Sequence, residues 1–152
     1  MRHLLIFLHL LGLVLWLGGG IAAMHVGIAM RRAVRAELTT LVAVQVRLLR
    51  AQILPGSLLV VLTGILLTLR LYGSATATAG YPTGLMVMQG AGLLGAVVVL
   101  VVMLPTVSRI ARLDPQGPQA PLFDALRNKA ALGGMVAGLL GLAALIGGAL
   151  LR

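Results

Sequence analysis

The sequence contains no cysteine and very little acidic charge. Without cysteine, disulfides, thiolate metal sites and cysteine catalysis are excluded. Only 3 of the 152 residues are Asp or Glu, and charged residues make up 10% of the chain, whereas soluble domains contain about 25%. Because 60% of the residues are hydrophobic, the composition indicates an integral membrane protein.

Motifs for common catalytic chemistries are also missing. The sequence has no serine–histidine–acid set, no HExxH and no phosphate-binding loop. No catalytic residue can therefore be assigned from a motif. The net charge of +9 resembles that of a nucleic-acid-binding protein, but the arginines flank apolar stretches, as the positive-inside rule describes. We therefore expect the lipid bilayer, and no nucleic acid, as the main partner.

Four long apolar stretches predict a single four-helix transmembrane domain over residues 1–152. The expected helices cover about residues 4–30, 38–72, 84–110 and 128–151. The first stretch continues well past a weak signal-peptide cleavage site, so we expect it to be retained as a membrane helix. In the second, residues 38–50 have the spacing of an amphipathic interfacial helix, and Pro55 is expected to kink its junction with the span.

The distribution of positive charge predicts how the helices are oriented. The connections between the first and second helices and between the third and fourth contain nine basic residues: Arg31, Arg32, Arg35, Arg47, Arg50, Arg109, Arg112, Arg127 and Lys129. The other side has three: Arg2, Arg70 and Arg152. Both termini are therefore expected on the non-cytoplasmic side.

Small residues predict how the helices associate, because lipid provides no hydrophobic drive for helix pairing. The fourth helix has a small-residue stripe at Gly134, Gly138, Gly141, Ala144 and Gly148. The other helices offer Gly18, Gly19, Gly20, Gly56, Ser57, Gly64, Gly92, Gly95 and Ala96. The expected fold is an all-α, antiparallel four-helix bundle.

His9 is the most informative residue, because an imidazole in hydrocarbon is costly unless it is paired. At about 100° per residue, the face of His9 also carries Gly12, Trp16 and Gly20. A flat cofactor could lie there, since glycine leaves room, tryptophan stacks, and imidazole is a common metal and haem-iron ligand. The alternative is that His9 only bonds a neighbouring helix or headgroup water.

His25 is a second candidate for cofactor or metal binding. It lies about 24 Å along the helix from His9, so the two rings cannot ligate one metal from the same helix. The alternative is that His25 snorkels at the interface beside Arg31 and Arg32. Gln89, at a similar depth to His9, is a candidate hydrogen-bond partner for it. Four methionines could serve as soft ligands or as core packing: Met24, Met86, Met88 and Met103.

Residues 7–19 and 54–67 resemble a group of small bacterial four-helix membrane proteins. The resemblance rests on Phe7, His9, Gly12, Trp16, Gly18 and Gly19, and on Pro55, Gly56, Thr63 and Gly64. The group includes the copper-resistance D-type domain, a predicted integral membrane family and, distantly, the membrane-type protoporphyrinogen oxidase. It implies a four-helix bundle in the bacterial cytoplasmic (inner) membrane, with haem at the position of His9 in the oxidase relatives. The lysine on a later helix of those relatives has no match, since the only lysine, Lys129, is expected at the cytoplasmic start of the fourth helix, far from His9.

Three hypotheses follow for the function. The first is a membrane redox or electron-transfer protein that binds haem b at His9. Because the later helices contain no histidine, the second axial position would be open, or filled by methionine, another subunit or a second copy of the chain. The second hypothesis is a non-catalytic accessory subunit of a larger membrane complex. The third is copper handling or transport by histidine and methionine.

Overall fold

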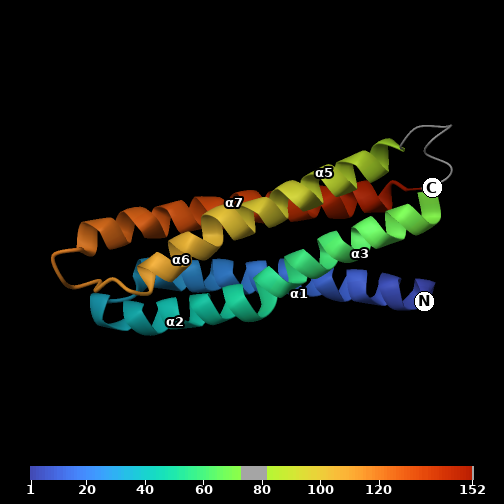
Figure 1. Cartoon of the computed structure of the whole chain (residues 1–152). Helices are drawn as coiled ribbons and strands as arrows, with labels where there is room; N and C mark the ends of the chain where they lie inside the picture. Colours follow the sequence, from blue (N-terminus) through green and yellow to red (C-terminus); the bar gives the residue numbers. More distant parts are fainter. Residues whose placement is uncertain (73–81, 152) are drawn as a thin grey trace.

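The computed structural model describes residues 1–72 and 82–151, and every regular element in them is helical (Figure 1). In chain order the elements are α1 (Arg2–Arg32), η1 (Arg35–Glu37), α2 (Leu38–Leu48), η2 (Leu49–Ile53), α3 (Leu54–Tyr72), α5 (Thr83–Val97), η3 (Val98–Met103), α6 (Leu104–Ile110) and α7 (Ala120–Ala149). The segments η2 and η3 are π-helical and continue directly into their neighbours, so each joins two α-helices into one long rod.

Four of these helical runs are long and apolar enough to cross a membrane: Arg2–Arg32, Arg35–Leu71, Thr83–Ile110 and Ala120–Ala149. Their outward surfaces are apolar, and side chains such as Phe7, Leu69 and Leu139 are about 60% or more exposed. Contiguous exposed apolar surface of this kind suits lipid rather than water. The predicted all-helical class with four long apolar helices is confirmed for the described residues.

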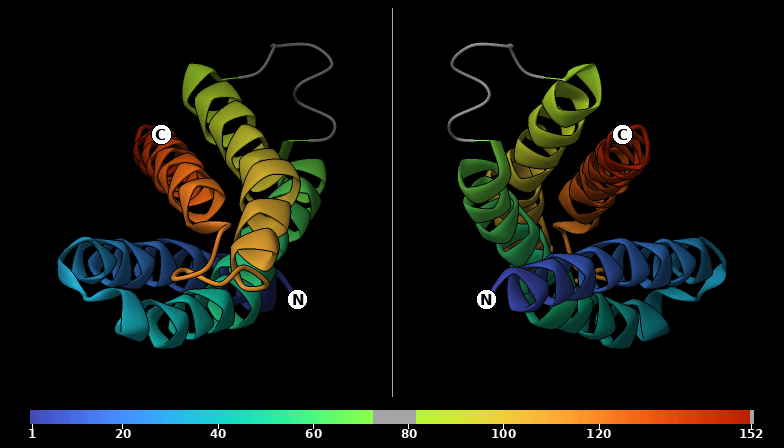
Figure 2. Two further views of the ribbon diagram at one scale, coloured as in Figure 1. Left: turned by 90° about the vertical axis from the view of Figure 1, so that its left-hand side faces the viewer. Right: turned by 90° about the vertical axis from the view of Figure 1, so that its right-hand side faces the viewer.

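The four runs alternate in direction along the length of the molecule (Figure 1). α1 packs mainly on α3, and α5 packs mainly on α7. The two marked chain ends lie together at one end, and the turns at residues 33–37 and 111–119 lie at the other, here called the loop end. End-on views show the α1–α3 pair crossing the α5–α7 pair (Figure 2). Residues 73–81 and Arg152 are outside the described residues.

The fourth helix is longer than the sequence pattern indicated. It begins at Ala120, with Pro121 in its first turn, and not near residue 128. Proline is tolerated in a first helical turn because the amide hydrogen it lacks would have no partner there. The additional turns bury Phe123, which is 1% exposed, so this segment belongs to the core and not to the loop.

The second and third helical runs each contain a π-helical segment just before a proline. η2 ends two residues before Pro55, and η3 ends two residues before Pro105. A proline removes one backbone donor and collides with the carbonyl four residues earlier, and a wider turn relieves both problems. Residues 38–50, expected at the interface, therefore run on through η2 into α3 as one helix.

α1 and α3 approach each other so closely that backbone meets backbone. A Cβ on Gly56 would lie 2.6 Å from the backbone nitrogen of Trp16 and 2.9 Å from the carbonyl oxygen of Gly12. A Cβ on Gly12 would lie 2.8 Å from Cγ2 of Val60. Only residues without a Cβ permit this approach, and such contact is the main attraction available to helices in lipid.

A second close crossing joins α5 and α7 near the end that carries the termini. A Cβ on Gly147 would lie 2.7 Å from the backbone nitrogen of Met88, and one on Gly84 would lie 2.8 Å from the carbonyl oxygen of Gly147. Each of the two main helix pairs is therefore held by glycines that face the partner's backbone.

The contact face of the fourth helix differs from the predicted stripe. Gly141 and Ala144 are buried as expected, but Gly134 is exposed and Gly138 has nothing within 4 Å of a Cβ position. The buried small residues of α7 are Ala130, Gly133, Ala137, Gly141, Ala144 and Gly147. Neighbouring helices decide between adjacent glycine rows: the side chain of Met103, for example, fills the space over Gly133.

Substitution of Gly56 by Val should weaken the α1–α3 pair selectively. The added side chain has to displace the backbone of α1, and overpacking of this kind costs about 1–3 kcal/mol. We expect a lower thermal midpoint of the detergent-solubilised protein, followed by circular dichroism. The matched control is Gly18→Val, because nothing lies within 4 Å of a Cβ there; equal losses in the two variants would contradict the proposed contact.

Candidate functional site

The ring of His9 packs on Gly64 of α3, beside Thr63 of the same helix. A Cβ on Gly64 would come 3.2 Å from Cε1 and 3.7 Å from Nδ1 of His9, which is closer than carbon atoms prefer for the first of these. Nδ1 of His9 is 3.0 Å from Oγ1 of Thr63. The ring is half-buried, so it is held between α1 and α3 and does not point away from the bundle.

The hydrogen bonds of Thr63 favour one tautomer of His9. The Thr63 hydroxyl has one hydrogen, and it donates that hydrogen to backbone carbonyls of its own helix, chiefly that of Leu59. With that hydrogen donated, its oxygen is left to accept from His9, an arrangement that favours a proton on Nδ1 and the lone pair on Nε2. Proteins orient metal-binding imidazoles in this way, with one nitrogen donating to an oxygen and the other facing the metal.

Gln89 makes a different contact from the one predicted. Its Nε2 donates to Oγ1 of Thr68 at 2.7 Å, and Thr68 donates to the carbonyl of Gly64 at 2.9 Å. The prediction that Gln89 bonds His9 is wrong, because Thr68 of α3 takes the amide instead. α3 therefore carries two threonines that each receive a hydrogen bond from a neighbouring helix.

Most of the remaining face expected to hold a cofactor is occupied by other helices. Val60 fills the space beside Gly12. Trp16 is 2% exposed, and its ring presses on Gly95 of α5, where a Cβ would lie 2.6 Å from Cζ2 and Cη2. Gly20 has nothing within 4 Å of its Cβ position. Gly12 and Trp16 thus join helices, and only Gly20 leaves free space.

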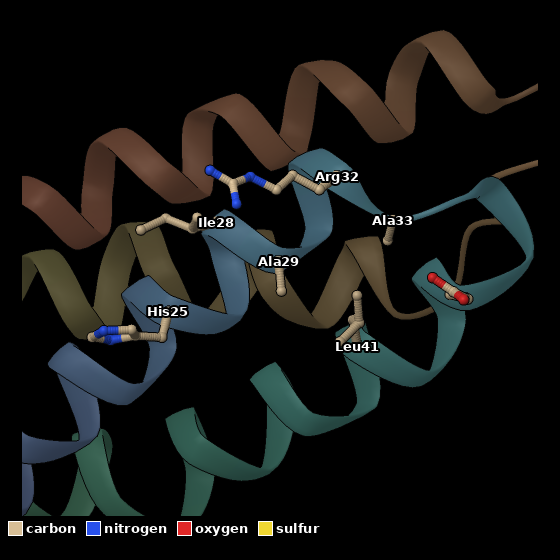
Figure 3. Close-up of a pocket in the computed structure, with 7 residues that line it drawn as sticks. His25, Ile28, Ala29, Arg32, Ala33 and Leu41 are labelled. Atoms are coloured by element: carbon tan, nitrogen blue, oxygen red, sulfur yellow. The ribbon is translucent and has the colours of Figure 1, made fainter.

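His25 lies towards the loop end of α1 and is not brought near His9. Its side chain is exposed, and Nδ1 is 2.9 Å from the carbonyl oxygen of Ile21, one turn earlier. A carbonyl only accepts, so this nitrogen is a donor. His25 also lines an open groove between α1 and α2 (Figure 3).

The described residues contain no ready-made metal cluster. Across residues 1–72 and 82–151, no three His, Asp or Glu side chains come together in a way that could hold an ion. Met24 and Met86 are exposed on different helices, whereas Met88 and Met103 pack against glycines of α7. The predicted soft ligands are therefore dispersed, and the best-oriented donor is Nε2 of His9.

An ionic cluster at the loop end was not identified from the sequence. Asp124 of α7 lies 2.8 Å from Nη2 of Arg35 and 3.5 Å from Nη2 of Arg127. Arg35 also donates to the carbonyl of Pro115, and Arg127 to that of Met30. The cluster connects the end of α1 and the segment η1 to the start of α7. Its one sequence signal is Asp124 three residues before Arg127, the spacing of neighbours on a helix.

No protein-family model matches this sequence, and no characterised protein or solved structure is significantly similar to it. Fold and site together define a bundle of four long apolar helices with one oriented histidine near the end that carries the termini. His9 fits haem or a metal as a single axial donor. Gly12 and Trp16 do not fit as walls of an enclosed cofactor pocket, because α3 and α5 fill the space beside them.

The protonation of His9 can be tested directly by nitrogen-15 NMR of histidine-labelled protein in detergent. We expect the neutral ring of His9 to be the Nδ1–H tautomer, because the Thr63 hydroxyl gives its hydrogen to a backbone carbonyl and its oxygen is left to accept. Thr63→Val should abolish this preference, whereas Thr68→Val, one turn away on the same helix, should leave it unchanged. A wild-type His9 signal from the Nε2–H tautomer would contradict a hydrogen bond donated by Nδ1 of His9 to Thr63. His9→Gln assigns the resonance.

Proposed function

We propose that the chain is a multi-pass protein of the bacterial cytoplasmic membrane that binds haem b through His9 and takes part in electron transfer. The observation that supports haem binding is the hydrogen bond between Nδ1 of His9 and Thr63, 3.0 Å long. It fixes the ring and leaves the lone pair of Nε2 available to a metal ion, as in histidine ligands whose other ring nitrogen is hydrogen-bonded to an oxygen. Haem bound there would supply a one-electron carrier.

The proposed orientation places both termini away from the cytoplasm. Arg31, Arg32 and Arg35 lie where α1 turns into α2, and Arg109 and Arg112 lie where α6 ends. These positions are at the loop end, opposite the chain termini (Figure 1). An excess of arginine on one side of a bundle marks the cytoplasmic side, so His9 would lie in the outer half of the membrane.

The haem would lie outside the bundle, along the seam between α1 and α3, because α3 covers the inner face of α1 at Gly12. All three histidines of the chain are on α1. A second axial ligand would therefore come from a second copy of the chain or from a partner subunit, and His9 would sit at that interface.

Absorption spectroscopy tests this proposal. We expect the protein purified from haem-supplied cells to show reduced-minus-oxidised bands of a b-type haem, which His9→Ala abolishes. The matched control is His25→Ala, which should retain them, because His25 is exposed at the other end of α1. Thr63→Val should lower haem affinity by about 10-fold or more, as loss of the group that orients a ligand does. Wild-type protein without haem bands would refute the proposal.

A second candidate function is that of a non-catalytic subunit of a larger membrane complex. Gly20 and Gly27 of α1 are seven residues apart and share one face of the helix, and neither has anything within 4 Å of a Cβ position. Outward-facing glycines allow a further helix to approach closely. This surface would accept a transmembrane helix of a partner subunit.

Native gel electrophoresis of mildly solubilised membranes distinguishes this candidate. We expect a complex larger than one chain that dissociates in the Gly20→Leu/Gly27→Leu double variant, while the thermal midpoint of the chain itself is unchanged. Leu142→Phe, on the exposed side of α7, is the control and should leave the complex intact. If the wild-type chain migrates alone, this function is excluded.

A further inference from the structure

The backbone of Arg50 lies well inside the apolar length of the bundle. A Cβ on Gly19 of α1 would lie 3.0 Å from Cβ of Gln52, so these two residues are at the same level. Arg50 comes just before Gln52 in η2 and is therefore level with about Ile21 of α1. That level is roughly 16 Å from Arg32, where α1 ends.

The side chain of Arg50 extends from this level towards the loop end. Val42 of α2 and Ile110 of α6 line one cavity and so lie at a similar level. Counting back along the two antiparallel runs, the backbone of Arg50 is level with about Val102. Its Nη2, however, is 3.5 Å from Oγ of Ser108, roughly 9 Å nearer the loop end. Long basic side chains reach towards a membrane surface in this way.

The charge of Arg50 has no carboxylate partner within the described chain. Asp124 is engaged by two other arginines, and Asp114 accepts a hydrogen bond from the backbone of its own loop. Glu37 is roughly 20 Å away along the same helical run. Arg47, about one turn nearer the loop end, is also exposed and outside the described ion pairs. An anion for this surface therefore has to come from outside the chain.

Ser108 adds a hydroxyl group from a second helix. Among the hydrogen bonds of the described residues, its oxygen accepts from Arg50 and its hydrogen has no acceptor. A guanidinium of η2 and a hydroxyl of α6 thus meet within 3.5 Å. A single phosphate group can accept hydrogen bonds from both.

We propose that Arg50 and Ser108 bind the phosphate of phosphatidylglycerol, an anionic membrane lipid, in the seam between α2 and α6. The planar guanidinium matches the geometry of a phosphate, and a bound phosphate lowers the cost of holding a cation beside hydrocarbon. The inference rests on insertion of the bundle in a membrane, which is part of the proposed function, but it does not require haem.

The surroundings of this seam favour an anionic lipid over a zwitterionic one. Phosphatidylcholine would bring its own cation close to Arg47 and Arg50, and no carboxylate is there to receive it. On the loop-end side of Ser108, a cavity of about 120 Å³ between Ala43 and Ala111 leaves space for a headgroup beyond the phosphate. We expect a preference for phosphatidylglycerol of about fivefold, or about 1 kcal/mol, the upper range for one exposed ion pair.

Native mass spectrometry of the delipidated, full-length protein tests the proposal. The protein is titrated in detergent with phosphatidylglycerol and phosphatidylcholine of identical acyl chains, and the bound fractions are compared. Arg50→Gln should weaken phosphatidylglycerol about fivefold and remove most of the preference, and Ser108→Ala should weaken it about threefold. The matched control is Arg31→Gln, which removes the same charge from the same end of the bundle, but from an exposed position on α1. It should retain the preference.

Three results would overturn the proposal. The first is equal binding of the two lipids by the wild-type protein. The second is an equal loss in Arg31→Gln and Arg50→Gln, which would indicate a diffuse effect of charge. The third is unchanged lipid binding in Arg50→Gln, as expected if Arg50 instead pairs with a carboxylate on a transmembrane helix of a partner subunit. Because lipid adducts and not haem absorbance are measured, failure here leaves the haem proposal untouched.

Discussion

The backbone contact between Gly12 of α1 and Gly56 of α3 determines the rest of the arrangement. Lipid gives apolar helices no hydrophobic drive to associate, so close approach must supply the attraction. Here a Cβ on Gly56 would lie 2.6 Å from the backbone nitrogen of Trp16, so only glycine permits the contact. One turn towards the N-terminus, the same face of α1 places His9 over Gly64. One turn in the other direction, it sends Trp16 into the centre against Gly95, which couples the α1 pair to α5.

This arrangement gives α1 two different ends. Near the terminus end, His9 is held by Thr63 inside an apolar surround, which is a setting for a ligand that needs one oriented nitrogen. At the loop end, α1 separates from α2 and leaves an open groove lined mainly by apolar side chains. In our proposal the first end holds a redox cofactor, while the cluster around Asp124 ties α1 and η1 to α7.

Hydropathy predicted the helices well, because the length and apolar character of a span are properties of one segment. The small residues of the second and third helices were also read correctly: Gly56, Gly92 and Gly95 are buried. The stripe of the fourth helix was only partly right, since glycine recurs so often there that the choice of face depends on side chains such as Met103. Likewise, the contacts of His9 with Thr63 and Gly64 depend on the register between α1 and α3. This register cannot be predicted from the pattern of a single sequence.

The most direct test of the account is an experimental structure of the protein in a lipid nanodisc, at a resolution that shows side chains and ligands. The account predicts that the His9 ring lies on Gly64, with Nδ1 at hydrogen-bonding distance from Thr63, and that density for a planar ligand continues from Nε2. A His9 ring turned away from α3 into lipid, with nothing bound to it, would contradict the account.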